Sequence, residues 1–181
     1  MSDALAIYLC WRERARRMVA RLPAATFYRR EADAVAASQA LLDHDPLVRS
    51  IHDRVASRLE DDLGHGLVHA TKVALDAGAL VHIEARAVES PDRLGHRIRI
   101  AQCAGLLHDL ARKQPDHAEA GAAQAADLLR AFPIDAVDAR DICSAIRNHE
   151  AFKDPPGIHS PSGALHSDCL YDADNFPWAP D

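Results

Sequence analysis

The sequence has few aromatic residues, and this shortage already limits the kind of core the chain can form. Phenylalanine, tyrosine and tryptophan make up 5% of its 181 residues, while hydrophobic residues of all kinds make up 48%. Alanine and leucine must therefore supply much of the apolar surface, which favours closely packed helices. This hydrophobic content, together with 27% charged residues, is typical of a globular domain and excludes a disordered chain.

Paired cysteines and long apolar runs are also lacking. The four cysteines are widely separated and form no CxxC pair, so neither a disulfide framework nor a zinc ribbon is predicted. No apolar run approaches the roughly 20 residues that span a bilayer. Arginines interrupt the first twenty residues, so we expect no signal peptide. We predict a cytoplasmic protein with no membrane partner.

An excess of positive charge is absent as well. The formal net charge is −6, which gives no strong signal for nucleic-acid binding. Residues 11–22 are an exception, because they hold five arginines and one glutamate. Two interpretations of this segment remain open: a solvated helix face, or a basic helix that attracts a polyanion or a partner.

Helical spacing of apolar residues is present in nearly every segment, and no convincing strand alternation is found. The clearest helix start is Asp45–Pro46, an N-cap followed by proline, before apolar residues at Leu47, Ile51 and Val55. Further helices are predicted over residues 3–22, 28–42, 66–89, 90–113, 115–132 and 135–148. A loop over residues 151–163 is predicted to precede a last short helix that bears Asp172 and Asp174. We predict an all-α fold in which a helical extension over residues 1–45 packs on a helical domain over residues 46–181.

Histidine is abundant: the chain has eleven, against four phenylalanines and three tyrosines. Metal binding or proton transfer would explain this excess. The most informative histidine is His108, which lies in the apolar run 104–113 and is followed at once by Asp109. Burying an unpaired carboxylate costs several kcal/mol, so a cation or hydrogen-bond donors must lie near Asp109.

Other metal-competent residues flank this doublet in the order His, His-Asp, His, His, Asp. They are His69 upstream, and His117, His149 and the acidic segment 172–174 downstream. Imidazole and carboxylate ligands together suit borderline divalent metals such as Mn, Fe, Co, Ni and Zn. The sequence therefore predicts a divalent transition metal, one ion or two, as the cofactor.

The ordered set resembles the HD-domain superfamily of metal-dependent phosphohydrolases over roughly residues 60–176. The resemblance implies an HD-domain helical bundle in which His69, His108, Asp109 and Asp174 hold one metal ion. Asp172 matches the same late aspartate of the family at one shift of register, so it remains an alternative to Asp174.

The two further histidines resemble the ligands of the subgroup that binds two metals. In that subgroup His117 and His149 would hold the second ion, and Asp109 would bridge the two ions. Arg112 stands where several two-metal relatives have a lysine, and its guanidinium would offset the charge of a substrate phosphate. His65, four residues before His69, would orient His69 or meet the substrate. Asp109, Arg112 and His65 are thus the candidate catalytic residues.

The activity implied by the resemblance is hydrolysis of a phosphoester or phosphoanhydride by a metal-activated water. The expected partner is a small phosphorylated substrate, either a nucleotide or a nucleotide-like molecule, and a homo-oligomer is compatible with the sequence. Two alternatives remain open. One is a di-iron oxygenase that cleaves C–C or C–P bonds, and the other is a regulatory or scaffold module with a structural metal.

Overall fold

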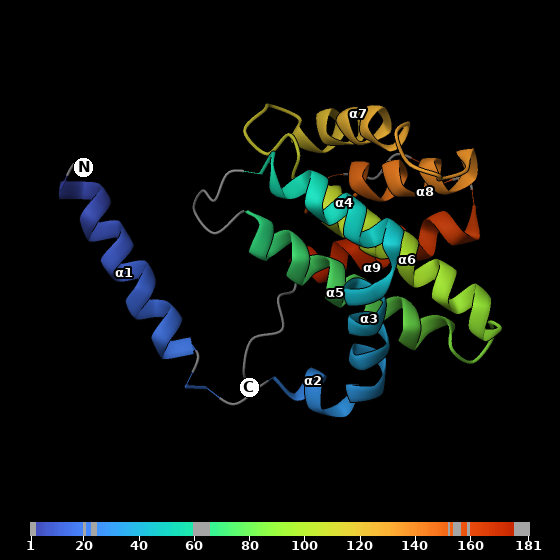
Figure 1. Cartoon of the computed structure of the whole chain (residues 1–181), viewed down its shortest axis with the longest axis horizontal. Helices are drawn as coiled ribbons and strands as arrows, with labels where there is room; N and C mark the ends of the chain where they lie inside the picture. The colour runs from blue at the N-terminus through green and yellow to red at the C-terminus, as the bar shows by residue number, and fades with distance from the viewer. Residues whose placement is uncertain are drawn as a thin grey trace. The chain divides into compact units, whose positions relative to one another are not determined.

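The structure is a computed structural model and describes residues 3–19, 21–22, 25–59, 66–151, 153, 157–158 and 160–175. Every regular element among these residues is an α-helix, so the predicted all-α fold is confirmed (Figure 1). In chain order the helices are α1 (Asp3–Val19), α2 (Thr26–Arg30), α3 (Ala32–His44), α4 (Pro46–Ala56), α5 (Leu67–Ala85), α6 (Pro91–Leu107), α7 (His117–Leu129), α8 (Ala136–Arg147) and α9 (Pro161–Asn175). Among the described helices, none combines the length and apolar character that crossing a membrane requires.

Contacts divide the chain into two units, which are described separately. The described residues up to Ala32 form the first unit, with α1 and α2. The second unit covers Asp33–Pro177 and holds nearly all of α3 and the whole of α4 to α9. The predicted domain boundary after residue 45 stays a prediction, and α3 belongs to the second unit by its contacts.

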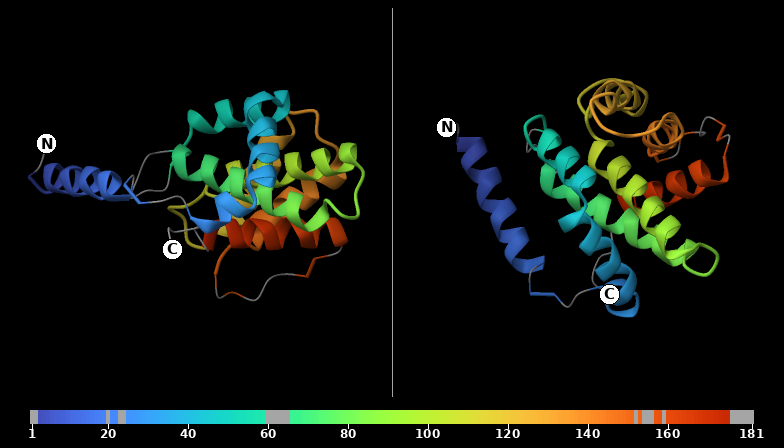
Figure 2. Two further views of the ribbon diagram at one scale, coloured as in Figure 1. Left: turned by 90° about the horizontal axis from the view of Figure 1, so that it is seen from below. Right: turned by 45° about the vertical axis from the view of Figure 1, so that its right-hand side comes forward.

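Helices α5 and α6 lie side by side at the centre of the second unit (Figure 1). They approach closely because Gly105 of α6 has no side chain. A Cβ atom at this position would lie 2.6 Å from the Cα atom of Ala74 in α5. Around this pair, α9 packs on α5 and α8, α4 packs on α6, and α7 packs on α8 (Figure 2).

Small and branched aliphatic side chains fill the core between these helices. Ile51, Leu106, Ile142 and Leu170 come from four different helices, and each is fully buried. Burying a side chain of this size contributes roughly 1.5–3 kcal/mol. The core therefore holds together helices that are distant in the sequence.

Buried polar groups join α3 to this core. The Gln102 side chain of α6 donates from Nε2 to the Ser38 carbonyl at 2.7 Å and to its Oγ at 2.9 Å. Ser38 Oγ in turn donates to the Leu75 carbonyl of α5 at 2.8 Å. These bonds fix α3 against both central helices.

The predicted start of α4 is confirmed in atomic detail. Asp45 is the N-cap, its carboxylate accepts from the backbone N–H groups of Leu47 and Val48, and Pro46 is the first helical residue. Asp135 caps α8 in the same way.

Several predicted helices have other bounds in the structure. The helix predicted over residues 66–89 ends at Ala85, and the last helix, predicted to be short, spans Pro161–Asn175. The segment 28–42 is not one helix, because α2 ends at Arg30 and α3 begins at Ala32. The helix predicted over residues 90–113 ends at Leu107. Beyond it the backbone N–H groups bond three residues back, from Leu110 to Leu107 and from Arg112 to Asp109, which makes successive tight turns.

Candidate metal centre

The residues predicted to bind metal converge where five helices of the second unit begin or end. They are His69 in α5, His108 and Asp109 directly after α6, His117 at the start of α7, His149 after α8, and Asp174 in α9. These residues are called the six-residue cluster below. The early end of α6 matters here, because it places His108 and Asp109 in a turn that faces the other helix ends.

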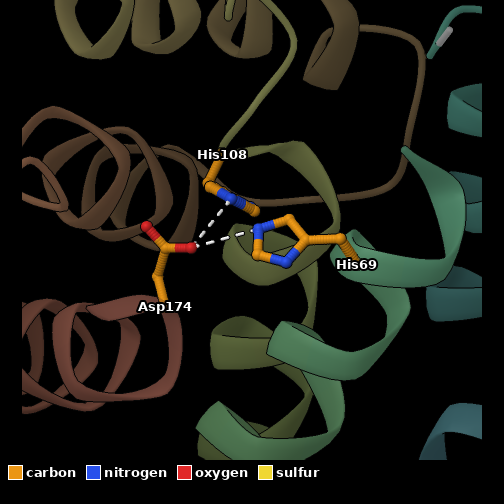
Figure 3. Close-up of side chains that lie close together, drawn as sticks. All are labelled: His69, His108 and Asp174. Atoms are coloured by element: carbon orange, nitrogen blue, oxygen red, sulfur yellow. Dashed lines mark ion pairs between the residues drawn. The ribbon is translucent and has the colours of Figure 1, made fainter. Parts of the chain in front are cut away.

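Three members of the cluster form a first group that could hold a metal ion. One ligand atom each of His69, His108 and Asp174 lies within 4.8 Å of the others. Asp174 Oδ1 is 3.1 Å from His69 Nε2 and 3.5 Å from His108 Nε2. Figure 3 shows both rings and the carboxylate pointing toward one another, each from a different segment.

The other three members, Asp109, His117 and His149, form a second group on the same criterion. Neighbouring rings connect the two groups: the centroids of His108 and His149 lie 5.2 Å apart, and those of His149 and His117 lie 5.1 Å apart. Asp109 Oδ2 is also 3.5 Å from His108 Nε2 of the first group. Asp109 thus lies between the groups, where a bridging carboxylate would have to be.

Backbone carbonyls orient two of the rings. His108 Nδ1 lies 2.8 Å from the Gly105 carbonyl, and His149 Nδ1 lies 2.5 Å from the Ile146 carbonyl. A carbonyl only accepts, so in both rings Nδ1 carries the proton donated to it. In a neutral ring this leaves Nε2 with a lone pair that can bind a metal.

Metal binding fits an otherwise unexplained feature of these rings. The Nε2 atoms of His108, His117 and His149 are buried and have no hydrogen-bond partner among the described residues. An unsatisfied buried polar atom costs about 1–3 kcal/mol. A divalent cation in the first group would satisfy the atom of His108, and one in the second group would satisfy those of His117 and His149.

The electrostatics of the cluster also favour a cation. Burial would lower the pKa of His108, but the carboxylates of Asp109 and Asp174 outweigh it and raise that pKa to about 10. Burial would raise the pKa of both aspartates, yet their contacts with the His108 ring hold both pKa values well below the usual range. Burial, and then the charge on His108, lowers the pKa of His149, which favours the neutral form of its ring. The two carboxylates therefore stabilise positive charge at this point.

The other residues predicted for the site do not belong to the six-residue cluster. Asp172 is exposed, so Asp174 is the aspartate of segment 172–174 that joins the cluster. Arg112 lies beside the cluster, with Nη1 3.8 Å from Asp109 Oδ1 and 43% of its side chain exposed. His65 lies outside the described residues.

Glu150 contacts the cluster, although the sequence pattern did not indicate it as a site residue. Its Oε1 lies 3.7 Å from His117 Nδ1, and its Oε2 accepts from Lys153 Nζ at 2.7 Å. The one available signal was its position directly after His149, and adjacency in the chain does not reveal that its side chain reaches the ring at the start of α7.

Comparison with known families decides the affiliation. The model of the HD domain matches residues 54–176, which is about two thirds of the chain. The chain belongs to the HD-domain family. This confirms the resemblance and gives the protein a place in a superfamily of metal-dependent hydrolases. No curated protein and no solved structure gives a match. The matched part of this HD domain includes the whole six-residue cluster.

Proposed function

We propose that this HD domain is a phosphohydrolase that binds two divalent transition-metal ions in the six-residue cluster. His69, His108 and Asp174 would hold the first ion, His117 and His149 the second, with Asp109 between them. The observation that carries the proposal is the set of buried imidazole Nε2 atoms without hydrogen bonds, beside carboxylates that favour positive charge. Such a donor set suits Mn, Fe, Co, Ni or Zn.

Two metal ions held by these residues would supply an acidified water as the nucleophile and would offset negative charge on the phosphoryl oxygens. The chain's own residues prepare the site. The hydrogen bonds from His108 and His149 to backbone carbonyls fix their rings before any ligand arrives. Arg112, next to Asp109 and partly exposed, can offer its guanidinium to a phosphate oxygen of the substrate. A phosphoester or phosphoanhydride of a nucleotide or nucleotide-like molecule is the proposed substrate.

Partial exposure of the cluster supports a reactive centre over a structural metal. The side chains of His69 and Asp174 are 22% and 14% exposed, so the first group keeps contact with solvent. A structural metal site is closed by four protein ligands, whereas a catalytic one leaves a position for water.

The test is turnover by the metal-loaded chain. Metal-depleted protein would be loaded with Mn, Fe, Co or Ni and assayed against nucleoside monophosphates, polyphosphates and dinucleotides, with oxygen consumption followed in parallel. We expect phosphate-ester or anhydride hydrolysis, a loss of at least about 100-fold in His108→Ala, and little change in His96→Ala. His96 is a matched control, because it lies on α6 but pairs with Asp138, outside the cluster. No hydrolysis with any of these metals would refute the proposal, and oxygen uptake without hydrolysis would favour the oxygenase alternative.

A further inference from the structure

His117 is held differently from the other two histidines whose Nε2 atoms lack a hydrogen bond. His108 and His149 each follow the end of a helix, and each ring reaches the carbonyl three residues back, that of Gly105 or Ile146. His117 is the first residue of α7, so no helical turn precedes it. The side chain near its Nδ1 is Glu150, from the segment between α8 and α9.

Lys153 holds this carboxylate and also reaches the residue before His117. Its Nζ donates to Glu150 Oε2 at 2.7 Å and lies 3.7 Å from Asp116 Oδ1. Asp116 has φ 52° and ψ 44°, and it is the one non-glycine residue with positive φ in the described part of the chain. A non-glycine residue rarely adopts this conformation, and such residues cluster at functional sites. Two separate features, the backbone of Asp116 and the Glu150 carboxylate, are therefore adjacent to His117.

We propose that Glu150 is a positioning residue that turns His117 Nε2 toward Asp109 and His149, and thereby sets the affinity of the second metal ion. This inference rests on the two-ion centre proposed above. Oε1 of Glu150 is 3.7 Å from His117 Nδ1, and a shift of roughly 0.8 Å brings the pair to hydrogen-bond distance. A metal ion on Nε2 makes Nδ1–H a stronger donor, so the carboxylate and the ion reinforce each other through the ring.

The consequence is an asymmetry between the two ions. Loss of a carboxylate that supports a ligating histidine lowers metal affinity by about 10–100-fold. Only the second group contains His117. Glu150 should therefore control whether this chain holds one ion or two, while the first group keeps its affinity.

The experiment is a metal titration of the full-length, metal-depleted chain. Co²⁺ binding would be followed by visible absorption and calorimetry, with stoichiometry from elemental analysis after equilibrium dialysis. In Glu150→Gln, which keeps the shape and removes the charge, we expect the second Kd to rise about 10–100-fold and the first to change less than about threefold. Lys153→Met should also raise the Kd of the second ion, but by a smaller factor than Glu150→Gln, because the Glu150 carboxylate remains.

Glu119→Gln is the matched control. Glu119 lies in the first turn of α7 and also links α7 to α8, but it pairs with Arg147 instead of a member of the cluster. The same substitution there should leave both dissociation constants unchanged. Circular dichroism of each metal-free variant checks that the helices are retained.

Three outcomes would overturn the inference. If Glu150→Gln binds both ions as the wild type does, Glu150 does not position His117. If the variant raises both dissociation constants equally, Glu150 stabilises the site as a whole and does not act on the second ion alone. Both outcomes leave the two-ion centre intact. If the wild type itself takes up one ion or none, the proposed two-ion centre fails, and the inference fails with it.

Discussion

Replacing Gly105 by alanine should destabilise the fold and weaken the first metal site together. The new Cβ would lie 2.6 Å from Ala74 Cα and 2.7 Å from Ala74 N, and ordinary contact begins at 3.4 Å, so α5 and α6 must separate by at least about 0.8 Å. Both opposing atoms are backbone and cannot rotate away. Overpacking of this kind costs about 1–3 kcal/mol, against about 1 kcal/mol gained in helix propensity.

The same displacement reaches the cluster. His69 is five residues before Ala74 on α5, and His108 is three residues after Gly105. Metal–ligand distances tolerate about 0.2 Å, so a shift of this size should lower the affinity for the first ion at least about tenfold. Urea unfolding of the metal-free protein and calorimetric metal titration would measure the two effects.

Gly95→Ala is the control on the same helix. A Cβ at Gly95 meets nothing within 4 Å, so this change should stabilise the protein by about 0.5–1 kcal/mol and leave metal binding unaltered. The reasoning is refuted if Gly105→Ala unfolds at the same urea concentration as the wild type or higher and binds the first ion equally well.

Three further predictions concern metal, acid and a helix cap. A divalent ion at 100 times its Kd should raise the free energy of unfolding by about 2.7 kcal/mol, and with it the Tm. A Tm that does not rise when the ion is added would exclude specific binding to the folded chain. The contact with His166 and two serine hydroxyls outweigh burial, which by itself would raise the pKa of Asp141, and lower that pKa from 3.8 to about 2. Because the folded pKa is depressed, the contribution of Asp141 is complete above pH 4 and is lost as the pH falls toward 2. Asp141→Asn should remove about 2 kcal/mol at pH 7 and flatten this acid dependence, measured by urea unfolding across pH; an unchanged profile would contradict it. Asp45→Ala should cost about 2 kcal/mol, since it removes the α4 cap and the 2.7 Å ion pair with Arg99, whereas a loss below about 0.5 kcal/mol in urea unfolding would show that neither matters.

Much of the helical organisation could be predicted because its signals are local. An aspartate followed by proline starts a helix because its carboxylate accepts from backbone N–H groups of the first turn, which have no partner within the helix. The helix start predicted at Asp45 is therefore confirmed. Helix ends were predicted less well. After Leu107 the apolar pattern continues, but the chain changes to tight turns. The break at Glu31 likewise has no strong sequence signal.

The candidate site divides in the same way. The residue types of the cluster were recognisable from their order in the chain, since few chemistries need that series of imidazoles and carboxylates. The contact of Glu150 with His117 was not recognisable, because it joins the segment after α8 to the start of α7. The sequence also left Asp172 and Asp174 as alternatives. Because α9 is a helix, their side chains lie on different faces: Asp172 is exposed, while Asp174 faces His69.

By itself the sequence determined the fold class and the residue types of the site. It specifies an all-helical chain with a His-Asp pair in an apolar run and four more metal-competent residues in a fixed order. Tertiary structure alone decided which atoms meet. Packing of α5 on α6 at Gly105, the end of α6 at Leu107 and the orientation of α9 bring one ligand atom of each residue within 4.8 Å of the others in each group. The physical reason is that local spacing fixes where a helix starts and which face is apolar, whereas distances between side chains on different helices depend on how those helices pack.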